Sequence, residues 1–289
     1  MYKAPWRGLN ALKKIGFLGP KGTFSHEIAQ KYCPRGDRGV LTVYQSIPDL
    51  MGAVDRGELE EAILPIENSL EGGVIPTLDI LMEAERVKIT GELTLAIHEN
   101  LLVKKGAERE RIQLIVSHAQ PLGQCRKYLH ENFPGVRLKS VDSTALAAEA
   151  VRSSDGTVAS VGSATAAEIY GLEILERDIQ DEKGNTTRFI IVGSGDPENR
   201  GKCKTSMIFS VGHIPGSLYK VLGILDLWEI NMTRIESRPT KGELGAYIFY
   251  VDIDGHMVDP DVAEAIQMIK RKTTFFKFLG SYSAASQDK

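Results

Sequence analysis

Gly184-Asn185-Thr186-Thr187-Arg188-Phe189 is the stretch of sequence that says most about the fold. Its polar part carries amide, hydroxyl and guanidinium groups. It leads directly into an apolar run, Phe-Ile-Ile-Val at 189–192, which predicts a central buried strand. Polar side chains at the end of such a strand can hold a small anion that carries a hydroxyl group. Taken alone, the stretch fits a surface loop with a solvated Arg188 equally well.

The composition bounds the class of protein. The chain has 289 residues, 42% hydrophobic and 25% charged, with a formal net charge of -3. This length suggests two or three compact units, and the charge offers no attraction for nucleic acid or an anionic membrane. No apolar run approaches the roughly 18 residues of a membrane span, and the N-terminus lacks the apolar segment of a signal peptide. We therefore expect a cytoplasmic protein without nucleic-acid or membrane partners.

The cysteines and histidines do not point to a metal. Cys33, Cys125 and Cys203 are far apart and odd in number, which predicts reduced thiols. The sequence contains no His-x-x-x-His or Cys-x-x-Cys pair, so we expect no zinc site. A nucleophilic pair of His118 and Cys125 is disfavoured, because the two are seven positions apart and a lone helical cysteine usually packs in the core.

From Lys14 to Val192, short apolar strands alternate with segments of helix length. The expected strands are 14–18, 40–43, 61–65, 113–117, 136–140 and 157–161, and the expected helices are 24–32, 46–55, 77–84, 119–132, 144–152 and 164–170. This alternation predicts a largely parallel sheet with helices on both faces. Because of Thr90, Leu93, Leu95 and Ile97, we interpret residues 87–105 as longer strands that cross into a second lobe. Two such lobes would form a cleft for a small molecule, although the periodicity fits one larger sheet as well.

After a polar, breaker-rich linker, the pattern changes. The expected strands are 206–211, 231–237, 246–252 and 274–279, with helices beginning at Pro215 and Pro260 and a turn at 240–243. The order βαββαβ predicts a ferredoxin-like unit.

Three further motifs lie where predicted strands end. Gly19-Pro20-Lys21-Gly22-Thr23-Phe24-Ser25 joins a strand to a helix, where glycines let backbone amides approach an anion. Pro65-Ile66-Glu67-Asn68-Ser69 and Ser117-His118-Ala119-Gln120 occupy equivalent positions, and Gln124-Cys125 follows the latter. Each motif alone is explained as well by a tight turn or a helix cap.

Together with Asn-x-Thr-Arg-Phe at 185–189, these motifs resemble, in order, those of the prephenate dehydratases. Ala119 stands where that family has proline, and Gly73 and Ile75 stand where it often has a hydroxyl and an amide. The resemblance covers about residues 14–282. It implies conversion of prephenate to phenylpyruvate in phenylalanine biosynthesis, by a lyase that needs no cofactor and no metal.

The resemblance also implies roles for individual residues. Thr187 would hydrogen-bond the departing hydroxyl group, and Glu67 would be the proton source if its pKa were raised. Three residues would position the substrate: Asn68, Ser117 and Gln124. Arg188 would pair with a carboxylate, or else brace its own loop. The remaining substrate-binding residues implied are Phe189, Thr23, Ser69 and Asn185.

Two C-terminal segments resemble the effector-binding segments of the ACT domains that are fused to prephenate dehydratases. They are Ile214-Pro215-Gly216-Ser217-Leu218 and Ile235-Glu236-Ser237-Arg238-Pro239. The resemblance implies allosteric regulation by L-phenylalanine. The effector-binding residues implied are Gly216, Ser217, Leu218, Glu236, Ser237, Arg238 and Pro239.

The resemblance implies a fold of two parts. A two-lobed, periplasmic-binding-protein-like α/β catalytic domain would span 14–194, with lobe 1 at about 14–96 and 174–194 and lobe 2 at about 97–173. A linker (195–202) and an α+β ACT domain (203–281) would follow. With the first strand at residue 14, we expect no N-terminal chorismate mutase, and we expect a homodimer or homotetramer. Two alternatives stay open: an arogenate dehydratase, and a non-catalytic amino-acid sensor.

Overall fold

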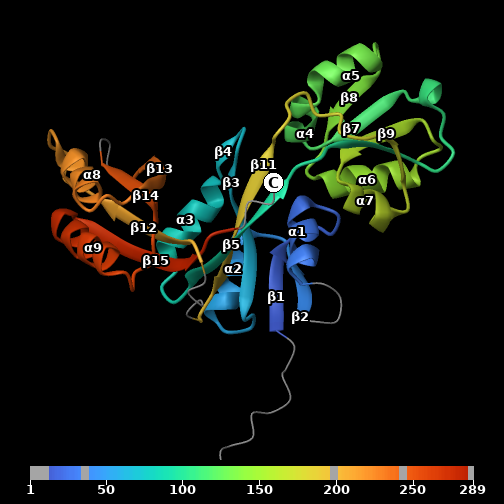
Figure 1. The fold of residues 1–289 in the computed structure, drawn as a ribbon. Coiled ribbons are helices and arrows are strands. Elements are labelled where there is room, and N and C mark those ends of the chain that lie inside the picture. The colour runs from blue at the N-terminus through green and yellow to red at the C-terminus, as the bar shows by residue number, and fades with distance from the viewer. Residues whose placement is uncertain (1–12, 34–38, 196–200, 241–245, 286–289) are drawn as a thin grey trace, which may run out of the picture. The chain divides into compact units, whose positions relative to one another are not determined.

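The computed structural model describes residues 13–33, 39–195, 201–240 and 246–285. By its internal contacts the chain divides into two compact units. Unit 1 is formed by residues 1–63 and 95–186, and unit 2 by residues 64–94 and 187–289. The fold is mixed α/β throughout (Figure 1). The predicted domain boundaries stay a prediction. Residues 241–243 of the turn predicted at 240–243, and most of the predicted linker, lie outside the described residues.

Unit 1 begins with a parallel three-stranded segment. β1 (Lys13–Leu18) pairs in parallel with β2 (Gly39–Tyr44) on one side and with the start of β3 (Glu61–Asn68) on the other. The connections are the helices α1 (Phe24–Tyr32) and α2 (Ile47–Asp55). Ser46 caps α2 as expected, because its side chain accepts a hydrogen bond from the backbone of Asp49 at 3.1 Å.

The second part of unit 1 is a five-stranded sheet in the order β10-β6-β9-β7-β8. Its strands are β6 (Asn100–Val103), β7 (Leu114–Ser117), β8 (Arg137–Ser140), β9 (Val158–Gly162) and β10 (Glu173–Glu176). Its helices are η1 (Arg109–Arg111), α4 (Ala119–Gln124), α5 (Arg126–Asn132), α6 (Thr144–Ser153) and α7 (Ala164–Tyr170). The single helix predicted at 119–132 is wrong, since the backbone leaves helical geometry at Cys125 (φ -110°, ψ 14°).

Two apolar cores cover the two faces of this sheet. Strand residues alternate between them, so that Leu101 belongs to one core and Leu102 to the other. The predicted parallel pairing is present between β7 and its neighbours β8 and β9, whereas β6 and β10 run antiparallel.

Unit 2 contains the rest of β3, β4 (Gly72–Gly73), α3 (Ile75–Glu83), most of β5 (Lys88–Ala96) and β11 (Thr186–Gly193). β11 lies between β3 and β5. The prediction that Pro65 ends its strand is wrong, because β3 continues to Asn68. Proline removes only the N–H donor, and its carbonyl here accepts a 2.7 Å hydrogen bond from the Thr77 hydroxyl of α3.

The remainder of unit 2 has the predicted βαββαβ order. Its elements are β12 (Cys203–Ser210), α8 (Ser217–Leu227), β13 (Met232–Pro239), β14 (Tyr247–Asp254), α9 (Pro260–Lys272) and β15 (Phe275–Ser283). The antiparallel sheet has the order β13-β14-β12-β15, which is the ferredoxin-like arrangement (Figure 1). We call residues 203–283 the C-terminal domain. α8 begins at Ser217 rather than at Pro215, because Gly216 is left-handed (φ 78°).

Apolar side chains of α8 and α9 pack against one face of this sheet, around Phe209, Val221, Val251 and Ile266. Residues of the sheet also contact β5 and α3 within unit 2. The Lys277 ammonium group donates to the carbonyls of Leu81 and Met82 at the end of α3, both at 2.8 Å. A cation is favourable there because the last carbonyls of a helix lack partners within the helix.

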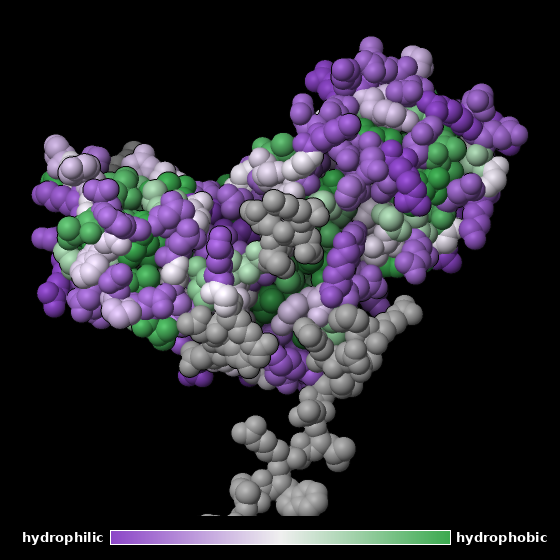
Figure 2. Space-filling model, in the orientation of Figure 1, coloured by the Kyte–Doolittle hydropathy of each residue, from purple (hydrophilic) through white to green (hydrophobic). Residues whose placement is uncertain are grey.

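No helix in the described ranges is long and apolar enough to cross a membrane. Figure 2 shows hydrophilic residues over much of the visible face, with apolar residues between them.

Gly280 gives a test of the packing between β15 and β5. Its φ is +146°, and a Cβ atom there would lie 2.2 Å from the backbone oxygen of Ile89. We expect Gly280→Ala to lower the free energy of unfolding by about 2–4 kcal/mol, through backbone strain and overpacking. Gly223→Ala in α8 is the control, because a Cβ atom meets nothing within 4 Å there. Denaturant titration measures both, and equal midpoints for the two variants would contradict this packing.

Candidate functional site

Asn68 and Thr187, both predicted from sequence, are brought together in unit 2. They lie on the neighbouring strands β3 and β11, and the Asn68 amide nitrogen donates to the Thr187 hydroxyl oxygen at 2.9 Å. The Asn68 amide oxygen accepts from the backbone nitrogens of Leu70 and Glu71 at 3.0 and 3.1 Å. These contacts fix the orientation of the amide, so its NH₂ group must face Thr187.

Glu67 and Arg188 come together as a second pair. Glu67 immediately precedes Asn68, and Arg188 immediately follows Thr187. Because consecutive side chains of a strand point to opposite faces, this second pair lies on the other face of the two strands. An Arg188 nitrogen lies 3.5 Å from a Glu67 carboxylate oxygen. The Glu67 carboxylate also lies 3.5 Å from the Arg234 guanidinium group. The predicted roles of Glu67 as a proton source and Arg188 as a substrate ligand stay predictions.

Arg188 is held by three other side chains. Its guanidinium group donates to Glu92 at 2.7 Å, to Asp252 at 2.6 Å and to the Tyr282 hydroxyl at 3.0 Å. Burial by itself lowers the pKa of Arg188, and the nearby Asp252, Tyr282 and Glu92 outweigh that effect and raise it. Sequence reasoning missed these three partners. The available signal was Asp252, an acidic residue inside the apolar strand 246–252.

Gln124 and Asn185 form the pair that the structure brings together in unit 1. The Asn185 amide donates to the Gln124 side-chain oxygen at 3.0 Å. The Gln124 side-chain nitrogen is buried and has no hydrogen-bond partner among the residues that the structure describes. A buried amide donor without a partner is costly, so this atom marks a place where a ligand oxygen would be stabilising.

Ser117 does not cap the helix that follows it. Its hydroxyl is fully buried and donates to the Val161 carbonyl of β9 at 2.7 Å. The cap of α4 is His118, whose ring nitrogen accepts from the Gln120 backbone. Ser117 therefore links β7 to β9, and its oxygen retains capacity to accept one more hydrogen bond.

The other predicted substrate ligands differ in accessibility. Thr23 caps α1, and its hydroxyl donates to the Pro20 carbonyl at 3.0 Å. Ser69 is exposed in the turn after β3. Phe189 is only 1% exposed, so its ring packs in the core of β11 rather than at a surface.

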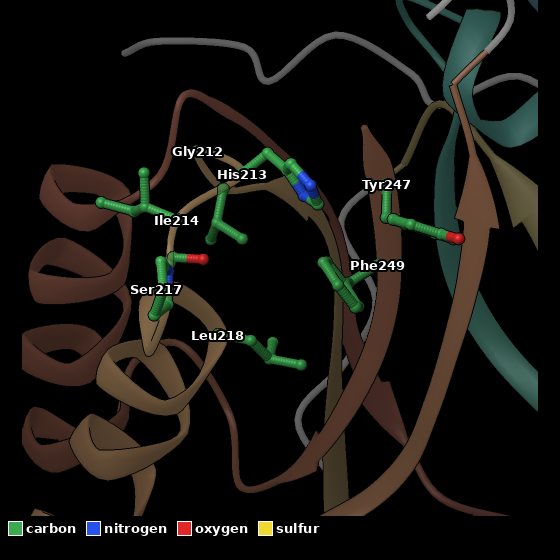
Figure 3. A pocket seen from close by; sticks show the side chains of 9 residues that line it. Gly212, His213, Ile214, Ser217, Leu218, Tyr247 and Phe249 are labelled. Carbon is green, nitrogen blue, oxygen red and sulfur yellow. The ribbon is translucent and has the colours of Figure 1, made fainter. Parts of the chain in front are cut away.

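The C-terminal domain contains a pocket of about 380 Å³ (Figure 3). Its lining is mainly apolar and comes from the β12–α8 connection, the start of α8 and β14: Val211, Gly212, His213, Ile214, Pro215, Ser217, Leu218, Tyr247 and Phe249. The volume suits a small organic molecule. Among the predicted effector residues, Ser217 and Leu218 line it.

The second predicted effector segment, residues 235–239, places alternate side chains on the two faces of β13. Ser237 and Pro239 pair with the pocket residues Phe249 and Tyr247. Directly opposed residues of an antiparallel pair share a face. The Glu236 carboxylate instead accepts from Arg234 at 2.6 Å, and Arg238 lies 3.4 Å from Asp79 of α3.

Glu99 is a buried carboxyl group that sequence reasoning missed. The residue is 1% exposed, and one of its carboxyl oxygens has no hydrogen-bond partner in the described part of the chain. Burial raises the pKa of Glu99 to about 8. Burial, followed by the charge of Glu99, raises the pKa of the nearby Cys125 thiol, which disfavours a thiolate nucleophile.

The protein has a mixed α/β fold, and the pairs Asn68–Thr187 and Gln124–Asn185 place amides and a hydroxyl near strand ends. Proteins of this class bind small ligands at the ends of their strands. The family model of prephenate dehydratase matches residues 15–197. The prephenate dehydratase of Methanocaldococcus jannaschii is 39% identical over 278 residues, which cover 93% of this chain and 98% of that protein. The chain belongs to the prephenate dehydratase family.

Two solved structures are also similar over nearly the whole chain. One is prephenate dehydratase from Arthrobacter aurescens in complex with L-Phe, with 34% identity, a TM-score of 0.85 and coverage of 93% of this chain and 89% of that chain. The other is GqqA, described as a novel type of quorum-quenching acylase, with 32% identity, a TM-score of 0.84 and coverage of 96% and 100%.

Glu99 predicts an unusual dependence of stability on pH. Its folded-state pKa of about 8 lies above its ordinary value of 4.5, so between these pH values the folded state binds more protons than the unfolded state. Stability therefore falls as pH rises from about 4.5 to 8, by on the order of 4 kcal/mol in total from this residue. We expect Glu99→Gln to remove that fall and to be more stable than the wild type at pH 8.

Urea unfolding at pH 5, 6.5 and 8 measures the effect. Glu110→Gln is the control, because Glu110 is an exposed carboxylate. If Glu99→Gln follows the wild-type pH profile, Glu99 is ionised in the folded protein at neutral pH.

Proposed function

We propose that this protein is a prephenate dehydratase, which converts prephenate to phenylpyruvate with loss of water and carbon dioxide, and that L-phenylalanine regulates it. The observation that carries the proposal is the hydrogen bond from Asn68 to Thr187. It occurs in a member of the prephenate dehydratase family, between two of the residues that the family motifs single out.

The geometry of this pair suits departure of a hydroxyl group. The Thr187 oxygen accepts from Asn68, so its own O–H is directed elsewhere and can donate to the ring hydroxyl of the substrate. A threonine hydroxyl is a poor acid, so it orients the leaving group and donates only partly. The ring becomes aromatic in the reaction, so the driving force lies in the substrate.

The polar groups of unit 1 are proposed to hold the substrate. Its two carboxylates need hydrogen-bond donors, and the unpartnered side-chain nitrogen of Gln124 is one such donor. The Asn185 amide fixes that side chain by donating to its oxygen. Ser117 keeps an acceptor site on its oxygen for a substrate hydroxyl.

The remaining parts of the proposal follow the family. The catalytic region is a two-lobed domain of the periplasmic-binding-protein type, the C-terminal domain is an ACT domain, and the enzyme is a cytoplasmic homodimer or homotetramer. The relative whose structure was solved with L-Phe supports phenylalanine as the effector.

The pocket of the C-terminal domain is the proposed effector site (Figure 3). A phenyl ring would lie against Ile214, Leu218 and Phe249. The carboxylate of the amino acid would meet backbone amides at the start of α8, where the helix dipole favours an anion. Glu236 and Arg238 contact Arg234 and Asp79 instead, so their predicted part in effector binding needs a test of its own.

Three rival functions are distinguished by substrate. Arogenate dehydratase would prefer the aminated substrate, and an amino-acid sensor would turn over neither substrate. An acylase, as suggested by the similarity to GqqA, would hydrolyse an amide. An acyl transfer of that kind needs a nucleophile activated by a base, whereas the partner of Thr187 is an amide.

Phenylpyruvate formation from prephenate and phenylalanine formation from arogenate, each compared with the spontaneous rate, test the proposal. We expect prephenate turnover well above its spontaneous rate, and Thr187→Ala should lower kcat at least a hundredfold, because the donor to the leaving group is lost. Thr187→Ser should restore most of the activity, and Thr186→Ala is the control on the same strand. A folded wild-type protein that fails to accelerate prephenate conversion would refute the proposal.

Calorimetry tests the effector pocket. Ile214 is 63% exposed and lines the pocket, so Ile214→Asp should leave the fold intact and place a charge in an apolar wall. We expect the affinity for L-phenylalanine to fall at least tenfold. Val258→Asp is the matched control, since Val258 is 69% exposed in the same domain and does not line the pocket. Equal affinities for both variants would move the effector elsewhere.

A further inference from the structure

The two strands that carry the proposed reaction present a different pair of residues on each face. Asn68 and Thr187 share one face of β3 and β11, and their immediate neighbours Glu67 and Arg188 share the other. A displacement of the Arg188 side chain therefore acts on the strand backbone next to Thr187.

Arg188 is bound mainly by residues far away in sequence. Asp252 belongs to β14, Tyr282 to β15 and Glu92 to β5, and all three side chains are almost completely buried. The Arg188 side chain is itself only 12% exposed, so the charges attract one another strongly. Removing one partner of a buried ion pair leaves an uncompensated charge, and the remaining groups must rearrange.

The same network fixes the partners of Arg188. The Ser206 hydroxyl contacts both the Asp252 carboxylate, at 2.5 Å, and the Tyr282 hydroxyl, at 2.7 Å. Lys204 donates to the other oxygen of Glu92 at 2.8 Å. Asp252 and Tyr282 of the C-terminal domain thus bind the Arg188 guanidinium group, and hydrogen bonds to Ser206 fix both of these side chains.

One strand connects this network with the pocket. β14 contributes Tyr247 and Phe249 to the pocket wall and Asp252 to the Arg188 pair. Phe249 and Asp252 are three steps apart along the extended strand, with two residues between them, which is about 10 Å. A ligand that shifts or stiffens β14 therefore acts on Asp252 without any further element between them.

We propose that Arg188 is a positioning residue, through which the C-terminal domain sets the position of the Thr187 hydroxyl and thereby the rate of the dehydratase reaction. The inference rests on the proposed function. It assigns Arg188 to regulation rather than to substrate binding, and it names the ion pair of Arg188 with Asp252 as the contact through which the effector pocket acts.

Asp252→Asn and Tyr282→Phe test the proposal, with Asp254→Asn as the matched control. Asp254 lies two residues further along β14 and pairs with Asn231 rather than Arg188. Steady-state kinetics with and without L-phenylalanine would be measured, together with melting temperature and hydrogen exchange of β11 amides. Tyr282→Phe removes one hydroxyl only, so it serves if Asp252→Asn does not fold.

We expect Asp252→Asn to lower kcat at least tenfold while KM changes less than threefold, because Thr187 is misplaced and the groups that bind the substrate are intact. L-phenylalanine should still bind within threefold of the wild-type affinity, yet change turnover less than twofold. Tyr282→Phe should shift kcat in the same direction by two- to fivefold. The amides of β11 should exchange at least threefold faster in Asp252→Asn, and Asp254→Asn should match the wild type throughout.

A folded Asp252→Asn or Tyr282→Phe enzyme with wild-type kcat and an intact response to L-phenylalanine would overturn the inference. A rise in KM alone would do the same, since it would make Arg188 a substrate ligand. If the wild type does not turn over prephenate, the proposed function fails separately. Hydrogen exchange then decides the inference, and equal β11 exchange in Asp252→Asn and Asp254→Asn would refute the coupling.

Discussion

The alternation of side chains along β3 and β11 is the constraint on which the rest of the site depends. A strand must point consecutive residues to opposite faces, so a polar dipeptide at its end serves two surroundings at once. Asn68 and Thr187 form a hydrogen-bonded pair on one face. Glu67 and Arg188, one position away, form an ion pair on the other. The hydrogen-bonded pair and the ion pair are thereby formed by adjacent residues of the same two strands.

The burial of Arg188 imposes a second constraint. A guanidinium group that is 12% exposed is tolerated only when carboxylates and hydroxyls satisfy its donors. Those partners come from β5, β14 and β15, which are far apart along the chain. Through these contacts Arg188 links β5 and β11 with the C-terminal domain inside unit 2. A domain attached only by a linker could move freely, whereas a domain whose side chains bind a buried cation cannot move without disturbing that cation.

Unit 1 contains buried polar groups whose hydrogen bonding is incomplete. The Gln124 side-chain nitrogen and one Glu99 oxygen are buried, and neither has a hydrogen-bond partner within the described ranges. Native proteins rarely leave such atoms unsatisfied unless a ligand or a function compensates. In the proposed function, the Gln124 nitrogen donates to a substrate oxygen. Glu99 avoids the cost of a buried charge by remaining protonated near neutral pH, as its raised pKa indicates.

The sequence predicted roles for Asn68, Gln124, Asn185 and Thr187, which stay predictions. What the sequence determined by itself was the local structure: the alternation of strands and helices and the βαββαβ order. Local patterns succeed there because periodicity, capping and strand ends depend on neighbouring residues. Only the tertiary structure decided which side chains meet. It extended β3 through Pro65, directed Ser117 to Val161, and surrounded Arg188 with Glu92, Asp252 and Tyr282. The physical reason is that a buried charge takes whichever partner the packing of distant segments brings within hydrogen-bond distance, and no local pattern of residues records that choice.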